Sequence, residues 1–166
     1  MGTKVRFEMV LMKEDEEEPE GEAVKVLLVE DHAVIREALA STFEGDGFEV
    51  VGQVGSMAEA RGIIQETQHP IEVALIGLGL PDGYGAELIE ELREAHPEAL
   101  VLSATLDRAN IARAVQRGAA EVIGKTAHLQ EVMEAVRRLR AGEMLIPLEE
   151  VVELLRFSSS RREEEH

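Results

Sequence analysis

This chain of 166 residues contains no cysteine and no apolar run long enough to cross a membrane. The absence of cysteine excludes a fold held by disulfides and favours a cytoplasmic location. A membrane-spanning helix needs about 20 consecutive apolar residues, so we expect no membrane association. The N-terminal apolar stretch leads into acids rather than a small-residue cleavage site, which argues against a signal peptide.

Basic residues are scarce as well. The sequence has 17 Lys and Arg against 34 Asp and Glu, a formal net charge of -17. Seven acids and one lysine lie within residues 13–22, which predicts that residues 1–23 form an acidic, disordered tail. An acidic arm that mimics or repels a polyanion is the functional alternative. Because phosphate contacts need clustered Lys and Arg, we expect no direct DNA binding by this chain.

Apolar runs alternate with amphipathic segments from residue 24 onward. Strand-like runs occur near residues 25–30, 48–54, 71–76, 99–103 and 120–124. The segments between them have helical spacing, and the first is expected to bury Val34, Ile35, Ala38, Leu39 and Phe43. A capping box over residues 56–59 predicts the start of the second helix. Repeated strand–helix alternation predicts one α/β domain with a parallel sheet covered on both faces.

The ends of these predicted strands carry side chains suited to phosphate and metal chemistry. Glu30 and Asp31 end the first strand, Ser103 the fourth and Lys125 the fifth, whereas Gly77 in the third offers no side chain. In open parallel sheets, ligands bind at the carboxyl ends of the strands. Paired carboxylates suit Mg²⁺, and an amine suits phosphoryl oxygens. Alternatively, the acids could favour a helix N-terminus, Ser103 could cap the next helix, and Lys125 could be a surface lysine.

Four segments together resemble the receiver domain of two-component response regulators, of the NarL/LuxR type. They are residues 26–39 (VLLVEDHAVIREAL), 78–85 (LGLPDGYG), 102–104 (LSA) and 114–125 (AVQRGAAEVIGK). The resemblance implies a flavodoxin-like (CheY-like), doubly wound, five-stranded sheet of order 2-1-3-4-5 over residues 24–142. It also implies phosphoryl transfer from a histidine kinase to an aspartate, assisted by Mg²⁺.

The resemblance also implies a role for each residue at the strand ends. Glu30 and Asp31 would bind the metal together with the backbone carbonyl of Gly79. Ser103 and Lys125 would contact the phosphoryl group, and Val122 occupies the position of a switch aromatic.

The phosphoacceptor position itself would be Gly77, which cannot act as a nucleophile. Its lack of a carboxylate predicts weak or absent Mg²⁺ binding. Asp82 follows as a turn residue and is not expected to replace the acceptor.

Residues 143–166 are expected to form a linker helix near residues 146–157 and a polar tail. In NarL/LuxR-type regulators such a linker leads to a helix-turn-helix domain, so DNA binding through a further domain is an expectation. The polar ending favours a fragment over a stand-alone protein. The apolar side of the helix is expected to dock on the receiver or on a second copy, which predicts a homodimer.

The sequence is compatible with three functions. The first is an atypical receiver that signals through protein contacts without an aspartyl phosphate. The second is an ordinary Mg²⁺-dependent receiver in which Gly77 is an engineered or accidental replacement. The third is a small enzyme on the same fold, disfavoured because the sequence shows no nucleophile and no general base. The histidines also lack metal-ligand spacing, and no dinucleotide-binding glycine motif is present.

Overall fold

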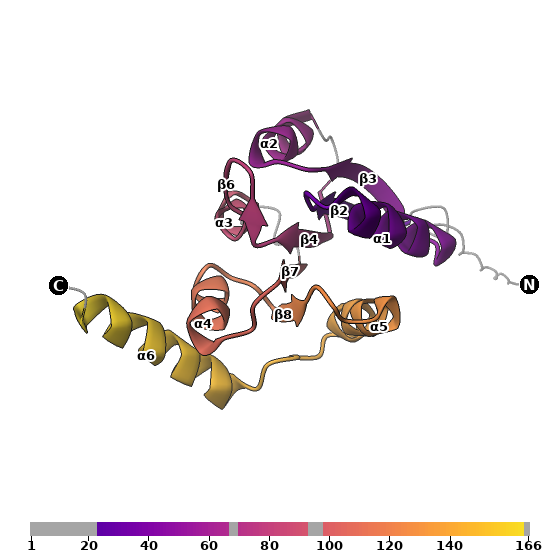
Figure 1. Ribbon diagram of the computed structural model, residues 1–166. Coiled ribbons are helices and arrows are strands. Elements are labelled where there is room, and N and C mark those ends of the chain that lie inside the picture. The colour runs from indigo at the N-terminus through magenta and orange to yellow at the C-terminus, as the bar shows by residue number, and fades with distance from the viewer. Residues whose placement is uncertain (1–22, 67–69, 93–97, 165–166) are drawn as a thin grey trace, which may run out of the picture.

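The structure is a computed structural model that describes residues 23–66, 70–92 and 98–164, so the predicted acidic tail lies almost entirely outside it. Five parallel strands form a single sheet with helices on both faces (Figure 1). The strands are β2 (Lys25–Val29), β3 (Glu49–Val54), β4 (Val73–Gly77), β7 (Glu98–Ser103) and β8 (Glu121–Gly124). Their order, β3-β2-β4-β7-β8, is 2-1-3-4-5 when these five are counted along the chain. The CheY-like sheet order predicted from the sequence is therefore confirmed.

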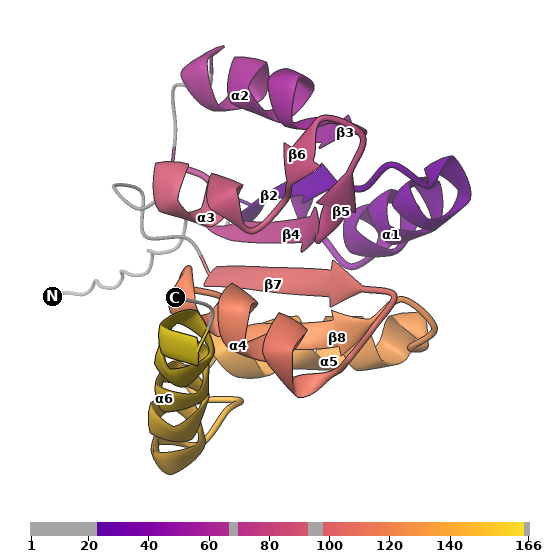
Figure 2. The same ribbon diagram turned by 60° about the vertical axis from the view of Figure 1, so that its left-hand side comes forward.

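The helices divide between the two faces of the sheet. Helices α1 (Ala33–Gly45) and α5 (Leu129–Arg140) cover one face, and α2 (Met57–Glu66), α3 (Glu87–Glu91) and α4 (Arg108–Gln116) cover the other (Figures 1 and 2). The central strand β4 is buried along its whole length. Its residues alternate between the two layers of core, with Ala74 and Ile76 in one and Val73 and Leu75 in the other. This is why the strand reads as a continuous apolar run.

Local signals in the sequence end and begin several helices as expected. In the capping box before α2, the Ser56 hydroxyl accepts from the Glu59 backbone N–H at 3.2 Å. Gly118 after α4 and Gly142 after α5 have φ of 112° and 90°, a left-handed conformation that stops a helix. One expectation is wrong, because Val34 is 80% exposed. It lies in the first turn of α1, past the carboxyl end of β2, where the sheet no longer covers it.

Two elements differ from the sequence prediction. A short hairpin of β5 (Gly79–Leu80) and β6 (Gly83–Tyr84) lies between β4 and α3. The C-terminal helix α6 (Leu148–Glu164) is longer than expected and packs against α4, away from the sheet (Figure 2). None of the helices within the described ranges combines the length and apolar content needed to cross a membrane.

Candidate functional site

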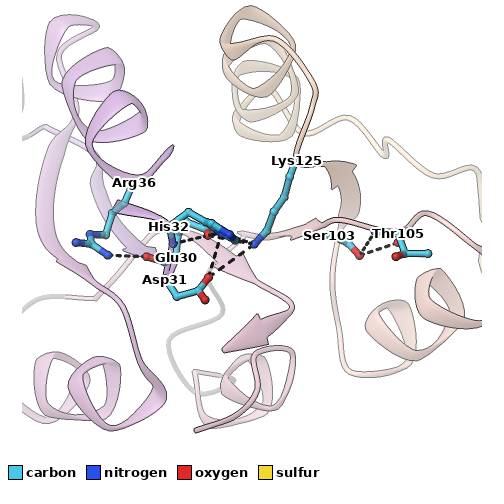
Figure 3. A network of polar contacts seen from close by, with 7 residues as sticks. All are labelled: Glu30, Asp31, His32, Arg36, Ser103, Thr105 and Lys125. Carbon is cyan, nitrogen blue, oxygen red and sulfur yellow. Dashed lines mark hydrogen bonds and ion pairs between the residues drawn. The ribbon is translucent and has the colours of Figure 1, made fainter. Parts of the chain in front are cut away.

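The carboxyl ends of the strands bring the predicted residues to one edge of the sheet. Glu30 follows β2, Gly77 ends β4, Ser103 ends β7 and Lys125 follows β8. The last two strands are joined at this edge by the Lys125 backbone N–H, which donates to the Ser103 carbonyl at 3.0 Å. Figure 3 shows Glu30, Asp31, His32 and Lys125 converging, although Lys125 is far away in sequence.

Glu30 is the buried centre of this cluster, with 1% of its surface exposed. Its Oε2 accepts from the His32 backbone N–H at 2.9 Å and from Lys125 Nζ at 3.1 Å. Its backbone carbonyl accepts from Arg36 Nη1 at 2.7 Å. Because a buried carboxylate must be paired to remain charged, these donors hold Glu30 in place.

The Lys125 ammonium is shared among three neighbours. Besides Glu30, it lies 3.8 Å from Asp31 Oδ1 and 3.2 Å from His32 Nδ1. The same ring nitrogen is 2.8 Å from Glu30 Oε2. A protonated Nδ1 donates to Glu30, whereas an unprotonated one accepts from Lys125, so one tautomer does not make both bonds. The Lys125 ammonium therefore offsets part of the negative charge of Glu30 and Asp31.

Gly77 lies directly beside the second oxygen of Glu30. A Cβ placed on Gly77 would be 2.8 Å from Glu30 Oε1, closer than real Cβ contacts. That oxygen is buried and has no hydrogen-bond partner among the residues that the structure describes. The Glu30 carboxylate thus projects into the space that a side chain at position 77 would occupy.

Ser103 points away from the acids in this structure (Figure 3). Its hydroxyl donates to the Thr105 carbonyl at 2.6 Å and accepts from the Thr105 backbone N–H at 3.1 Å. It does not cap the following helix, because Asp107 is the N-cap of α4 and accepts from the Asn110 backbone N–H. The structure thus places Ser103 at the edge but does not join it to the Glu30–Lys125 cluster.

Asp82, at the tip of the β5–β6 hairpin, caps the start of α2. Its two carboxylate oxygens accept from the backbone N–H groups of Met57 at 2.8 Å and Ala58 at 3.0 Å, at the start of α2. These hydrogen bonds lower the pKa of Asp82 below its usual value. The carboxylate is therefore committed to capping a helix.

A cavity of about 400 Å³ opens beside the strand ends. Its lining is His32, Leu78, Gly79, Tyr84, Ser103, Ala104, Thr105 and Lys125. The Tyr84 hydroxyl is buried and has no hydrogen-bond partner in the described part of the chain, and burial raises its pKa. The Arg113 guanidinium lies 4.4 Å from the centre of the Tyr84 ring, a cation–π contact. Sequence reasoning missed Arg36 and Tyr84, because their contacts join different elements: Arg36 of α1 reaches the Glu30 carbonyl, and Tyr84 of the hairpin meets Arg113 of α4. It also missed Thr105, although the two-residue spacing from Ser103 is a local signal for a hydroxyl-to-backbone turn.

Val122, at the predicted switch position, lies in β8 and is 8% exposed, with its side chain in the core on the side of α2, α3 and α4. It also lines a second, larger hollow of about 800 Å³ between β8, α5 and the loop before α4. That hollow contains none of the acids at the end of β2.

Three adjacent residues could offer ligand atoms to a metal ion. One atom each from Glu30, Asp31 and His32 lies within 4.8 Å of the others. Gly79 is close enough to share the cavity but lies in the hairpin rather than in this group. The Lys125 ammonium contacts both carboxylates, at 3.1 Å from Glu30 and 3.8 Å from Asp31, and Gly77 adds no carboxylate oxygen to the group.

A doubly wound sheet with acids, a hydroxyl and a lysine at its carboxyl edge is the arrangement of a signal receiver. The family model for the response regulator receiver domain matches residues 26–137. This chain belongs to the response regulator receiver domain family.

Individual relatives agree with this assignment. The chain is 34% identical over 127 residues to a protein of Pseudomonas aeruginosa described as a transcriptional regulator. It is 33% identical over 126 residues to the DNA-binding transcriptional activator DevR/DosR of Mycobacterium tuberculosis. Both matches cover 74% of this chain but only 59% and 57% of those proteins. Among solved structures, the signal receiver domain of NarL from Mycobacterium tuberculosis matches with a TM-score of 0.65 and 27% identity, over 73% of this chain and 98% of that one.

Proposed function

We propose that this receiver domain works without an aspartyl phosphate at the usual position, and that Gly77 occupies that position. The observation that carries the proposal is the contact between Gly77 and Glu30. Gly77 ends the central strand at the edge where the acids and Lys125 meet, and it offers no nucleophile. Glu30 Oε1 lies in the space that an acceptor side chain would need. Asp82 is engaged in capping α2 and does not replace it.

The charge balance of the site supports a domain that needs no metal. The Lys125 ammonium lies 3.1 Å from Glu30 and 3.8 Å from Asp31, where a divalent cation would compete with it. If a metal ion were present, Glu30, Asp31 and the Gly79 carbonyl would hold it. We infer that Mg²⁺ binding is weak or absent in this chain.

Signalling would then depend on protein contacts. A domain with two conformations responds to any partner that binds one of them more tightly, whether or not a phosphoryl group is added. The partner would be a histidine kinase or another cytoplasmic signalling protein, and a second copy of the chain would serve as well. Because two relatives are described as transcriptional regulators, we propose that the output is transcription, through a DNA-binding domain outside this chain.

The test is incubation of the wild-type chain with a small phosphodonor and Mg²⁺, followed by intact-mass measurement. We expect no phosphoryl group on the wild type and Mg²⁺-dependent labelling of Gly77→Asp. Labelling of the wild type would overturn the proposal. If neither protein is labelled, the site has changed at more than one position. Gly77→Asn, which has similar bulk but no nucleophile, is the matched control.

A second candidate is an ordinary phosphorylated receiver in which Gly77 is an isolated replacement. The presence of Glu30, Asp31, Ser103 and Lys125 at one edge favours it. Efficient labelling of Gly77→Asp, at a rate similar to that of ordinary receivers, would support this candidate. Slow labelling would support a site already adapted to the glycine.

A further inference from the structure

Helix α6 carries apolar side chains on two different faces. Leu154 is 2% exposed, and Val151 and Phe157 pack beside it against Ala112 and Val115 of α4. A separate set is exposed: Leu148 at 64%, Val152 at 38% and Leu155 at 40%. The spacing of this exposed set, i, i+4 and i+7, aligns it as a stripe along one side of the helix.

The inner face of α6, formed by Val151, Leu154 and Phe157, holds the helix against α4 and so gives the exposed stripe a defined position. Arg108 of α4 donates to Glu150 at 3.0 Å, and its guanidinium lies 5.8 Å from the centre of the Phe157 ring. Helix α6 lies at the periphery of the molecule in both views, with α4 on one side only (Figures 1 and 2). Within the part of the chain that the structure describes, no large apolar surface covers the exposed stripe.

We propose that the Leu148–Val152–Leu155 stripe of α6 binds the same stripe of a second copy in antiparallel orientation. This inference deepens the self-association included in the proposed function and rests on it. Val152 would lie near the two-fold axis. Leu148 lies four residues before it and Leu155 three residues after it, so at about 1.5 Å of rise per residue each faces the other in the partner. Such an interface is self-complementary, as a two-fold dimer requires.

The charges beside the stripe favour this orientation and this partner. Glu149 and Arg156 are both exposed and lie on the same side of the stripe. In an antiparallel two-fold pair the same side of each stripe meets, so Glu149 of each copy faces Arg156 of the other. In a parallel two-fold pair that side of one copy faces the opposite side of the other, and this Glu–Arg pairing is not made. Within one copy, Arg156 also lies 3.7 Å from Glu153, a contact exposed to solvent. An exposed ion pair of this kind is weak enough to be shared with a partner.

The association should be weak and sensitive to salt. A stripe of three side chains buries less area than a permanent dimer needs, and two copies of net charge -17 repel each other. Because about 0.15 M salt limits this repulsion to roughly 8 Å, the dimer should be easier to detect at that concentration than at very low salt.

The experiment is sedimentation of the full chain over a wide concentration range in 0.15 M salt, comparing wild type with Val152→Glu. Val34→Glu is the matched control, because Val34 is 80% exposed on α1 and receives the same added charge. Circular dichroism checks that helicity is retained. We expect the wild type and Val34→Glu to dimerise with similar dissociation constants and Val152→Glu to weaken the dimer at least tenfold.

Charge exchange tests the orientation. Glu149→Arg and Arg156→Glu should each weaken the dimer, and the double variant should recover it. A wild type that stays monomeric throughout would overturn both this inference and the self-association in the proposed function, but not the absence of phosphorylation. A dimer equally insensitive to Val152→Glu and Val34→Glu would overturn this surface alone. Failure of the double variant to recover would overturn the antiparallel arrangement.

Discussion

Glu30 Oε1, which accepts no hydrogen bond from any described residue, lies 2.8 Å from the point where a Cβ on Gly77 would stand. The two residues belong to adjacent strand ends, β2 and β4, and each limits what the other can be. Glycine leaves room for the Glu30 carboxylate to turn inward, and the inward carboxylate leaves no room for a larger residue without movement. The absence of a side chain at position 77 and the orientation of the Glu30 carboxylate therefore depend on each other.

Substitution of Gly77 should therefore destabilise the fold. We expect Gly77→Ala to lower the free energy of unfolding by about 1–3 kcal/mol, because the added methyl group displaces a buried carboxylate. Gly77→Asp should cost more in the absence of metal, since it adds a third carboxylate near Glu30 and Asp31. Urea denaturation with and without MgCl₂ measures both effects. Mg²⁺ should stabilise Gly77→Asp but neither the wild type nor Gly77→Asn; equal stabilisation of all three would contradict the expectation.

Removal of the Lys125 ammonium should show how much the Glu30–Lys125 ion pair contributes to the stability of the fold. We expect Lys125→Met to lower the free energy of unfolding by roughly 3 kcal/mol, because it leaves a buried carboxylate without its cation. The double variant Glu30→Gln/Lys125→Met should cost less than the sum of the single variants, with a coupling energy of at least about 1 kcal/mol. Simple additivity in urea denaturation would show that the pair is not energetically coupled.

Acid should weaken the cap of α2. Hydrogen bonds from the backbone N–H groups of Met57 and Ala58 lower the pKa of Asp82 below its ordinary value. A carboxyl whose pKa is lower in the folded state contributes stability above its unfolded pKa, and this contribution is lost as pH falls through the folded pKa. Asp82→Asn keeps one acceptor but cannot ionise. The stability difference between wild type and Asp82→Asn should therefore shrink below about pH 4, as measured by thermal unfolding at a series of pH values. A difference that is independent of pH would contradict this.

The docking of α6 on α4 should contribute to stability through its inner face only. Leu154→Ala should lower the free energy of unfolding by about 2–4 kcal/mol, because Leu154 is 2% exposed in a packed cluster. Leu155→Ala, on the exposed stripe, should change it by no more than about 0.5 kcal/mol. Both are measured at low micromolar concentration, where self-association is negligible. Equal effects of the two variants would mean that α6 is not docked as the structure describes.

Much of the fold follows from local sequence. The buried strand β4 reads as an unbroken apolar run because both of its faces are covered, and Gly118 and Gly142 end helices because they adopt positive φ. The exposure of Val34 could not be read from helical spacing, because the spacing does not tell where the sheet ends beneath the helix. The sequence also did not show which apolar residues of α6 are buried and which are exposed, because that depends on which side of the helix packs against α4.

The succession of strands and helices along the chain, the side chains at the strand ends and the lack of a side chain at Gly77 can all be read from the sequence, because they depend on residue type and periodicity. How those side chains contact one another depends on the folded structure. It paired Lys125 with Glu30 across 95 residues, turned Ser103 toward Thr105 and left Glu30 Oε1 facing the glycine. The Glu30–Lys125 and Glu30–Gly77 contacts join segments that only the packing of helices on the sheet brings together, whereas the turn of Ser103 toward Thr105 is a local choice that competes with contacts to the acids.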